Sequence, residues 1–157
     1  MDADLDALAQ RESDLILPRF SNDDAWWLGC FLRDAGASCQ APIAIDISVG
    51  PTTLFTALLP GATADNLGWI KRKVAIAWRY QKSSYLMNQK FAGGENMFER
   101  FGLDHATYAA AGGAVPIRVA GVGMIGVVAV SGLPQLDDHL MVLDALGALQ
   151  NKQKGEA

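Results

Sequence analysis

Two pairs of short segments show apolar patterns typical of β-strands: alternation in the first pair, and β-branched or continuous apolar runs in the second. In the first pair, isoleucine or valine recurs at every second position of residues 43–49, and residues 53–59 return after a Gly50-Pro51 turn. In the second pair, residues 116–120 and 124–130 are rich in valine and isoleucine and flank the tight turn at 121–123. Each pair predicts a β-hairpin.

Helical periodicity is the second pattern along the chain. Ser21 stands three residues before Asp24, which resembles a capping box and predicts a helix over residues 22–34 that ends at Gly36. Thr63 or Asp65 is expected to cap a longer helix over residues 66–81. Shorter helices are predicted at 4–11 within an N-terminal segment 1–14, from a Ser83-Ser84 cap through 87–91 to a stop at Gly93-Gly94, at 96–101, and at 103–109 with Asp104 as its cap.

A closing helix is signalled from Leu133 and Pro134 onward. Asp137 and Asp138 fall in its first turn, where carboxylates complement the positive end of the helix dipole. The side expected to face the sheet carries Leu136, Leu140, Leu143 and Gly147. His139 lies on the flank of that side and is therefore expected at the edge of the core, and the tail 151–157 is expected to fray.

The helix over residues 66–81 is apolar on two sides. Its main stripe is Leu67, Ile70, Val74 and Trp78. The opposite side carries Trp69, Ile76 and Tyr80. A helix that is apolar on two sides is enclosed either within one protein or between subunits, and the small size of this domain favours a contact between subunits and thus a homo-oligomer. Basic residues fill the rest, either as a solvated or salt-bridged flank or as contacts for propionates or phosphates: Lys71, Arg72, Lys73, Arg79 and Lys82.

Gly121, Gly123 and Gly126 match the G-x-G-x-x-G string of dinucleotide-binding folds. That fingerprint requires a helix directly after the glycines, so that a pyrophosphate meets the helix N-terminus. Residues 127–130 read Val-Val-Ala-Val and favour a strand instead. The glycines are better explained as a hairpin turn and one close backbone approach.

Composition and charge predict a single-domain protein without a membrane span and without a nucleic-acid partner. The 157 residues suit one domain over 1–157, and no apolar run approaches the about 20 residues of a membrane span. The acidic start is unlike an export signal, which predicts a cytoplasmic protein. A net charge of −4 argues against a nucleic-acid partner, and Cys30 and Cys39 are spaced as two reduced thiols rather than a metal or redox pair.

The order and spacing of several strings resemble the GlcG/HbpS-like family, the haem-degrading domain family, and are closest to a branch of small uncharacterised bacterial and fungal proteins. The similarity covers nearly the whole chain. The strings are AWWLG at 25–29, ALLPGATADN at 57–66, WIKRKVAIAWRYQKSSY at 69–85, RFGLD at 100–104 and YAAAGGAVPIRVAGVGMIGVVAVSGLPQLDDH at 108–139.

The resemblance implies an α+β, profilin-like fold in which helices flank both faces of a five-stranded antiparallel sheet. It also implies dimers that assemble further, and a link to haem or related tetrapyrroles. One position departs from the family pattern. Many relatives are expected to have His just before the Gly-Gly pair, where this chain has Ala111, followed after the pair by Ala114 and Val115 instead of Cys-Phe.

Candidate haem contacts follow from that expectation. An axial donor is most often His, Met, Cys or Tyr, so His139 and His105 come first and Tyr108 next, ahead of Tyr85 and Met124. Packing in a core is the alternative role for each of them.

Two basic residues are the cationic candidates. Arg118, on a strand, is expected to point to solvent, to form a buried pair with Asp46, or to hold a propionate. Lys73, from the basic flank, is a further propionate contact.

Hydrolytic and metal chemistry find little support. No string resembles a nucleophile elbow, and residues 137–139 diverge by about 100° each on a helix, so they do not converge on one metal ion.

Two hypotheses about the function remain, and they belong to different classes. The first is a homo-oligomer that binds haem or a related tetrapyrrole, with any degradation chemistry supplied by the cofactor and its oxidant. The second is a non-catalytic assembly or adaptor protein whose apolar helix faces serve self-association and partner docking; a small-molecule or corrinoid accessory domain is a third.

Overall fold

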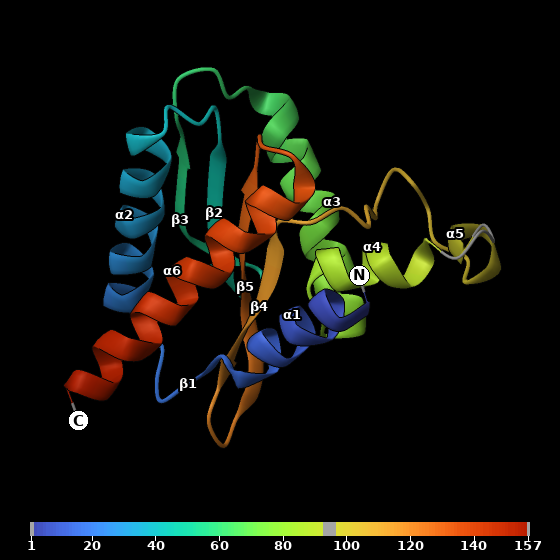
Figure 1. Cartoon of the computed structure of the whole chain (residues 1–157). Coiled ribbons are helices and arrows are strands. Elements are labelled where there is room, and N and C mark those ends of the chain that lie inside the picture. Colours follow the sequence, from blue (N-terminus) through green and yellow to red (C-terminus); the bar gives the residue numbers. More distant parts are fainter. Residues whose placement is uncertain (1, 93–96, 157) are drawn as a thin grey trace.

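The computed structural model has an α+β fold and describes residues 2–92 and 97–156 (Figure 1). Within these residues the helices are α1 (Asp2–Asp14), α2 (Asn22–Ser38), α3 (Ala64–Tyr80), α4 (Ser84–Phe91), α5 (Met97–Arg100) and α6 (Gln135–Gly155). The strands are β1 (Ile16–Leu17), β2 (Ala44–Val49), β3 (Thr52–Leu58), β4 (Ala114–Val119) and β5 (Gly123–Ser131). None of the described helices is long and apolar enough to cross a membrane. The predicted helix stop at 93–94 lies outside the described residues.

The strands form one five-stranded sheet in the order β1, β4, β5, β2, β3. Both predicted hairpins are confirmed, because β2 pairs with β3 and β4 pairs with β5 in antiparallel register, and β5 joins the two hairpins through β2. The expectation of a fully antiparallel sheet needs one correction. β1 lies parallel to β4, with Ile16 opposite Arg118 and Leu17 opposite Val119.

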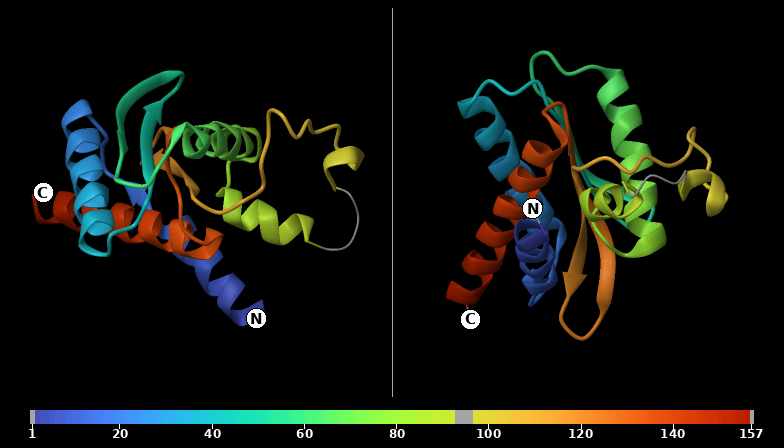
Figure 2. Two further views of the ribbon diagram at one scale, coloured as in Figure 1. Left: turned by 90° about the horizontal axis from the view of Figure 1, so that it is seen from above. Right: turned by 45° about the vertical axis from the view of Figure 1, so that its right-hand side comes forward.

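Helices cover both faces of the sheet, as predicted (Figure 2). On one face, α2 packs on β2, where Ile45 and Ile47 are fully buried, and α6 packs on β4 and β5. On the other face, α3 packs on small residues, among them Ala44 of β2 and Ala129 of β5. Small side chains allow a helix to approach a sheet closely, so the core on this face is thin.

The capping signals are confirmed, but one helix end is not. Ser21 and Asp24 form the predicted capping box of α2, and Thr63 forms another at α3 with Asn66. Gly36 was expected to end α2, yet the helix continues through it to Ser38. A Cβ at Gly36 would lie 2.7 Å from Cδ1 of Ile43, so this glycine permits close packing on the sheet and does not stop the helix.

Helix α6 differs from expectation in its buried side and in its length. Leu136, assigned to the core side, is 38% exposed, whereas His139 is fully buried beside Val142 and Leu146. The tail does not fray at 151, because the helix continues to Gly155 and Gln153 is buried, donating a hydrogen bond from Nε2 to the carbonyl of Arg19 at 2.9 Å.

The second apolar side of α3 is covered by the same chain. Ile76 is fully buried in a cluster with Met87, Phe98 and Leu103, and Tyr80 packs against this cluster. The expectation that Ile76 contacts another subunit is therefore wrong. For Trp69, which is 38% exposed, and for the half-buried Tyr80, a subunit contact stays a prediction. The segment after α3 folds back over it, through α4, α5 and a run of turns.

The helix predicted over residues 103–109 is wrong as well. Asp104 instead caps a turn, accepting hydrogen bonds from the backbone N–H of Ala106 at 2.9 Å and the hydroxyl of Thr107 at 3.1 Å. Short polar side chains of this type compete with helix formation by bonding locally to the backbone.

Candidate functional site

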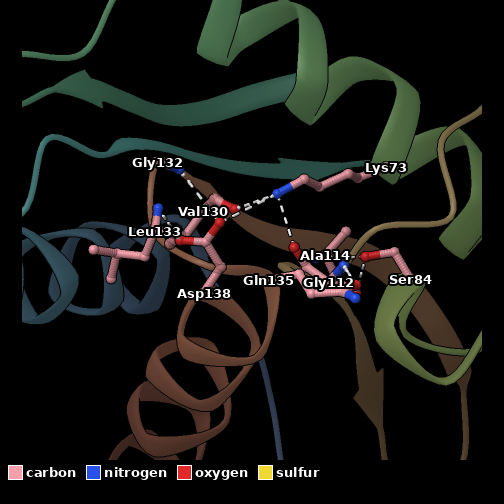
Figure 3. Close-up of polar contacts among 9 residues, drawn as sticks. All are labelled: Lys73, Ser84, Gly112, Ala114, Val130, Gly132, Leu133, Gln135 and Asp138. Atoms are coloured by element: carbon pink, nitrogen blue, oxygen red, sulfur yellow. Dashed lines mark hydrogen bonds and ion pairs between the residues drawn. The ribbon is translucent and has the colours of Figure 1, made fainter. Parts of the chain in front are cut away.

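Lys73 is the buried centre of a polar cluster between α3, α6 and the sheet (Figure 3). Its side chain was expected on a basic flank, but the residue is only 3% exposed. Its Nζ donates to the carbonyl of Gly112 at 2.8 Å, the carbonyl of Val130 at 3.0 Å and Oδ2 of Asp138 at 3.4 Å. Since an ammonium group has three protons, all of them have acceptors here.

Asp138 is the ionic partner of Lys73 and also organises the start of α6. Its carboxylate accepts hydrogen bonds from the backbone N–H groups of Gly132 at 3.3 Å and Leu133 at 3.0 Å. Pro134, at the N-cap position, supplies no side-chain cap, so Asp138 satisfies donors that precede the helix. The helix-dipole explanation of Asp138 is thus incomplete, because the residue is 2% exposed and ion-paired.

Burial shifts the pKa values of Asp138 and Lys73 in the directions that favour their uncharged forms. Burial raises the pKa of Asp138 from 3.8 to about 6, while attraction to Lys73 and the two backbone hydrogen bonds oppose the rise. Burial lowers the pKa of the Lys73 ammonium, again against the attraction of Asp138. The hydrogen bonds to both groups favour the charged pair, which is the state we assign near neutral pH.

A polar cavity of about 260 Å³ lies beside this ion pair. The residues that line it are Asp65, Asn66, Trp69, Lys73, Ala111, Gly112, Ser131, Gly132, Leu133, Gln135 and Asp138. Two carboxylates and one ammonium contribute its charge, so the cavity does not favour an anionic ligand.

The segment 109–114 runs along this cavity and is held by hydrogen bonds on both sides. Asn88 donates to the carbonyl of Ala110 at 2.8 Å, and Gln135 accepts from the N–H of Gly112 at 2.9 Å. Gly113 has φ +133°, and a Cβ there would lie 2.3 Å from the carbonyl oxygen of Val130 and 2.7 Å from Nζ of Lys73. Only glycine fits this position, so the segment and the ion pair are fixed together.

An aromatic pocket of about 380 Å³ lies on the other side of the same segment. Its lining residues are Trp69, Arg72, Asn88, Phe91, Ala92, Phe98, His105, Tyr108, Ala109, Ala110 and Ala111. The His105 ring stacks on Phe98 with 4.5 Å between centroids, and the Tyr108 hydroxyl accepts a hydrogen bond from Arg79 at 3.4 Å. The pocket therefore offers two atoms that can coordinate iron, a ring nitrogen of His105 and the hydroxyl oxygen of Tyr108, between apolar walls.

Three of the predicted site residues are brought near one another. His105 and Tyr108 share the aromatic pocket, and Lys73 lines the adjoining polar cavity. Ala111, where relatives are expected to have His, lines both, as does Trp69. The two cavities thus meet at the position where this chain departs from the family pattern.

His139 lies apart from these cavities, in the core under α6. Its ring stacks on Tyr85 with 4.9 Å between centroids, and neither ring nitrogen has a hydrogen-bond partner within residues 2–92 and 97–156. Burial, with a smaller contribution from the positive charge of Arg11, lowers the pKa of His139 from 6.5 to about 4. The imidazole is therefore neutral near pH 7.

Arg118 lies apart as well, at the junction of α1 with the sheet. Its guanidinium donates to the carbonyl of Gln81 at 2.5 Å and lies 3.8 Å from Oε2 of the buried Glu12. The expected pair with Asp46 is wrong, because Asp46 lies opposite Thr56 and Ala129 in the sheet.

Two further parts of the site were not recognised in the sequence. Phe98 supplies the aromatic wall under His105, and Gln135 holds the 109–114 segment. Neither has a local signal, since their partners are distant along the chain. In the described part of the chain, no three His, Cys, Asp or Glu side chains are placed to hold a metal ion.

Comparison with known proteins identifies the family. The haem-degrading HbpS-like protein family matches residues 20–147, so the chain belongs to this family. A UPF0303 protein of Streptomyces coelicolor is 47% identical over 140 residues, which cover 88% of this chain and 89% of that protein.

Solved structures agree with this assignment. The crystal structure of the Ybr137w protein is 35% identical with a TM-score of 0.88, over 94% of this chain and 88% of that one. The PduOC haem complex is 17% identical with a TM-score of 0.69, over 82% and 94%, and shows the shared fold.

Proposed function

We propose that this protein binds haem, or a related tetrapyrrole, in the aromatic pocket. The observation that carries the proposal is the set of groups gathered there: His105 and Tyr108 as donors, Arg72 as a cation, and the rings of Phe91 and Phe98 as walls. His and Tyr are both known axial ligands of haem iron, apolar walls suit the porphyrin ring, and a cation suits its propionates. The family description and the haem bound to the structurally similar PduOC support the choice of ligand.

His105 is the axial donor that we favour. Its ring is oriented by stacking on Phe98, with 15° between the ring planes, and the residue is exposed. No hydrogen bond to its ring is found among the described residues, so a ring nitrogen is free to coordinate. Tyr108 comes second, because its hydroxyl already contacts Arg79. His139 would have to leave a closed core before it could coordinate.

The cations for the propionates are Arg72 and Arg79 rather than Lys73 or Arg118. The Arg72 guanidinium lies 4.2 Å from the centre of the Trp69 ring and donates to the carbonyl of His105. Lys73 has no unused proton, which leaves it the role of fixing the 109–114 segment. When bound, haem iron would supply any redox chemistry, while these residues bind and orient the ring.

A haem titration followed by absorbance tests the proposal. The wild-type protein should give a saturable, stoichiometric change in the Soret band, and His105→Ala should weaken binding by about tenfold or more. His139→Phe is the matched control and should bind as the wild type does. A flat wild-type titration would overturn the proposal, whereas a loss confined to His139→Phe would move the axial donor into the core.

Self-association is a second candidate function, favoured by the outer edge of the sheet. β3 is an edge strand without a charged residue, and Trp26 of α2, 66% exposed, packs edge-on against Phe55 of this strand. Unprotected edges and exposed aromatic residues are typical of contacts between chains. Light scattering should report a homo-oligomer whose mass falls in Trp26→Asp; an unaltered mass would exclude this edge as the contact.

A further inference from the structure

A groove of about 610 Å³ lies between α3 and the β2-β3 hairpin, away from both cavities described above. It exists because α3 packs chiefly on β4, β5 and β2, while β3 extends beyond the helix at the edge of the sheet. The residues that line it are Asp46, Ser48, Gly50, Pro51, Thr53, Thr56, Leu67, Ile70, Lys71, Val74, Ala75 and Trp78.

The helix side of this groove is apolar. Leu67, Ile70, Val74 and Trp78 are spaced three or four residues apart, so they form one stripe along α3. The outer part of that stripe is open, since Leu67 is 36% exposed. An apolar wall of this kind, ending in an indole ring, suits an organic ligand more than a hydrated ion.

The floor of the groove contains one half-buried carboxylate without a partner. Asp46 alternates with Ile45 and Ile47, which point into the opposite core, so its side chain faces the groove. Burial raises the pKa of this carboxyl. Asp46 accepts no hydrogen bond and forms no ion pair with any residue in 2–92 or 97–156, including Lys71 at the rim.

The hydroxyl group of Thr56, next to Asp46, can also accept a hydrogen bond. Thr56 lies directly opposite Asp46 in the β2-β3 register and donates its hydroxyl proton to the carbonyl of Ile45 at 3.1 Å. The lone pairs of that hydroxyl therefore remain available to a ligand. A carboxylate and a hydroxyl acceptor in a groove that an indole ring also lines match a ligand that has only donors and a positive charge, because ring faces also attract cations.

We propose that this groove binds an organic ammonium ion with an apolar body. The ammonium group donates to the Asp46 carboxylate and to the hydroxyl oxygen of Thr56, and the apolar body lies along Ile70, Val74 and Trp78. A partly desolvated carboxylate gains more from a cation than an exposed one does, because the surrounding dielectric is lower. The site is distinct from the aromatic pocket, and the Asp46 carboxylate disfavours a ligand that places a carboxylate beside it.

Calorimetric titration with phenethylammonium, beside its uncharged analogue 2-phenylethanol, tests the proposal. The wild-type protein should bind the ammonium compound saturably and at least about tenfold more tightly than the alcohol. Asp46→Asn keeps the shape of the side chain and should remove that preference. Asp34→Asn, which makes the same charge change at an exposed position of α2, should leave it intact.

Two results would overturn the proposal. One is the absence of saturable binding by both phenethylammonium and hexylammonium in the wild-type protein. The other is equal affinity in wild type and Asp46→Asn, once thermal unfolding shows that the variant is folded. A second variant, Trp78→Leu, should weaken phenethylammonium more than 2-phenylethanol, because it removes the ring face and keeps an apolar side chain.

Discussion

Lys73 and Asp138 form an ion pair between α3 and α6, with 3.4 Å between Nζ and Oδ2 and both residues almost fully buried. The two are 65 positions apart in the sequence. Their other hydrogen bonds reach Gly112 and Val130 from one side and Gly132 and Leu133 from the other. The pair therefore joins the start of α6 to the segment that separates the two cavities.

Breaking this pair should be costly. Lys73→Met leaves the Asp138 carboxylate buried without its cation, which should lower the free energy of unfolding by about 3 to 5 kcal/mol. The double variant Lys73→Met with Asp138→Asn should lose less than the sum of the two single losses. Urea denaturation of the four proteins measures this cycle, and a single-variant loss under about 1 kcal/mol would mean that the pair is not buried as described.

Gly113 should tolerate no larger side chain. Gly113→Ala brings a methyl group onto the Val130 carbonyl at a positive φ, whereas Gly121→Ala, at φ +75°, meets nothing within 4 Å. Strain alone costs about 1 to 3 kcal/mol, so Gly121→Ala should lose about that much and Gly113→Ala clearly more. Thermal or urea unfolding distinguishes them; equal losses would argue against the close contact at Gly113.

Stability should depend on the protonation of His139. The unfolded chain protonates this residue near pH 6.5 and the folded chain only near pH 4, so stability falls as the pH drops between these values. The difference between these two pKa values corresponds to about 3 kcal/mol in the free energy of unfolding. Asp138 acts in the opposite direction, because its folded pKa of about 6 exceeds 3.8, and stability is gained as the pH falls through that window.

The variant His139→Phe isolates the histidine contribution. It loses no hydrogen bond, since both ring nitrogens lack partners among the described residues, and it keeps the stacking on Tyr85. Its stability relative to wild type should be nearly constant above pH 7 and rise by about 3 kcal/mol between pH 6.5 and 4. Urea denaturation across this range measures it, and a difference that does not change with pH would contradict the buried, neutral imidazole.

Ala111→His should strengthen haem binding. The new imidazole would stand where the two cavities meet, close to the pocket that holds His105. Haem titration should show tighter binding, and Ala111→His should restore binding to His105→Ala. If neither spectrum nor affinity changes in the single or double variant, haem does not occupy this side of the 109–114 segment.

The sequence was sufficient for the elements that local signals define. Alternating apolar residues predicted the first hairpin, and apolar runs on either side of a glycine turn predicted the second. Ser21 and Thr63 marked two helix starts. Local patterns gave wrong helix ends where contacts between residues distant in the sequence determine the structure. Gly36 reads as a helix stop but serves close packing on Ile43, and the tail after 150 stays helical because Gln153 is anchored on Arg19.

The site was only partly predictable for the same reason. His105, Tyr108 and Lys73 could be selected by residue type, yet nothing in the sequence pairs Lys73 with Asp138 or places Phe98 under His105. The apolar side of α3 around Ile76 looked like a subunit interface because the segment that covers it has no regular pattern of its own.

Hydrogen-deuterium exchange of the wild-type protein with and without haem tests the central proposal most directly. If haem binds in the aromatic pocket, peptides that span residues 98–113 and the middle of α3 should exchange more slowly with haem, while the His139 region of α6 stays unchanged. Saturable haem binding with protection confined to α6, or with no protection at 98–113, would contradict it.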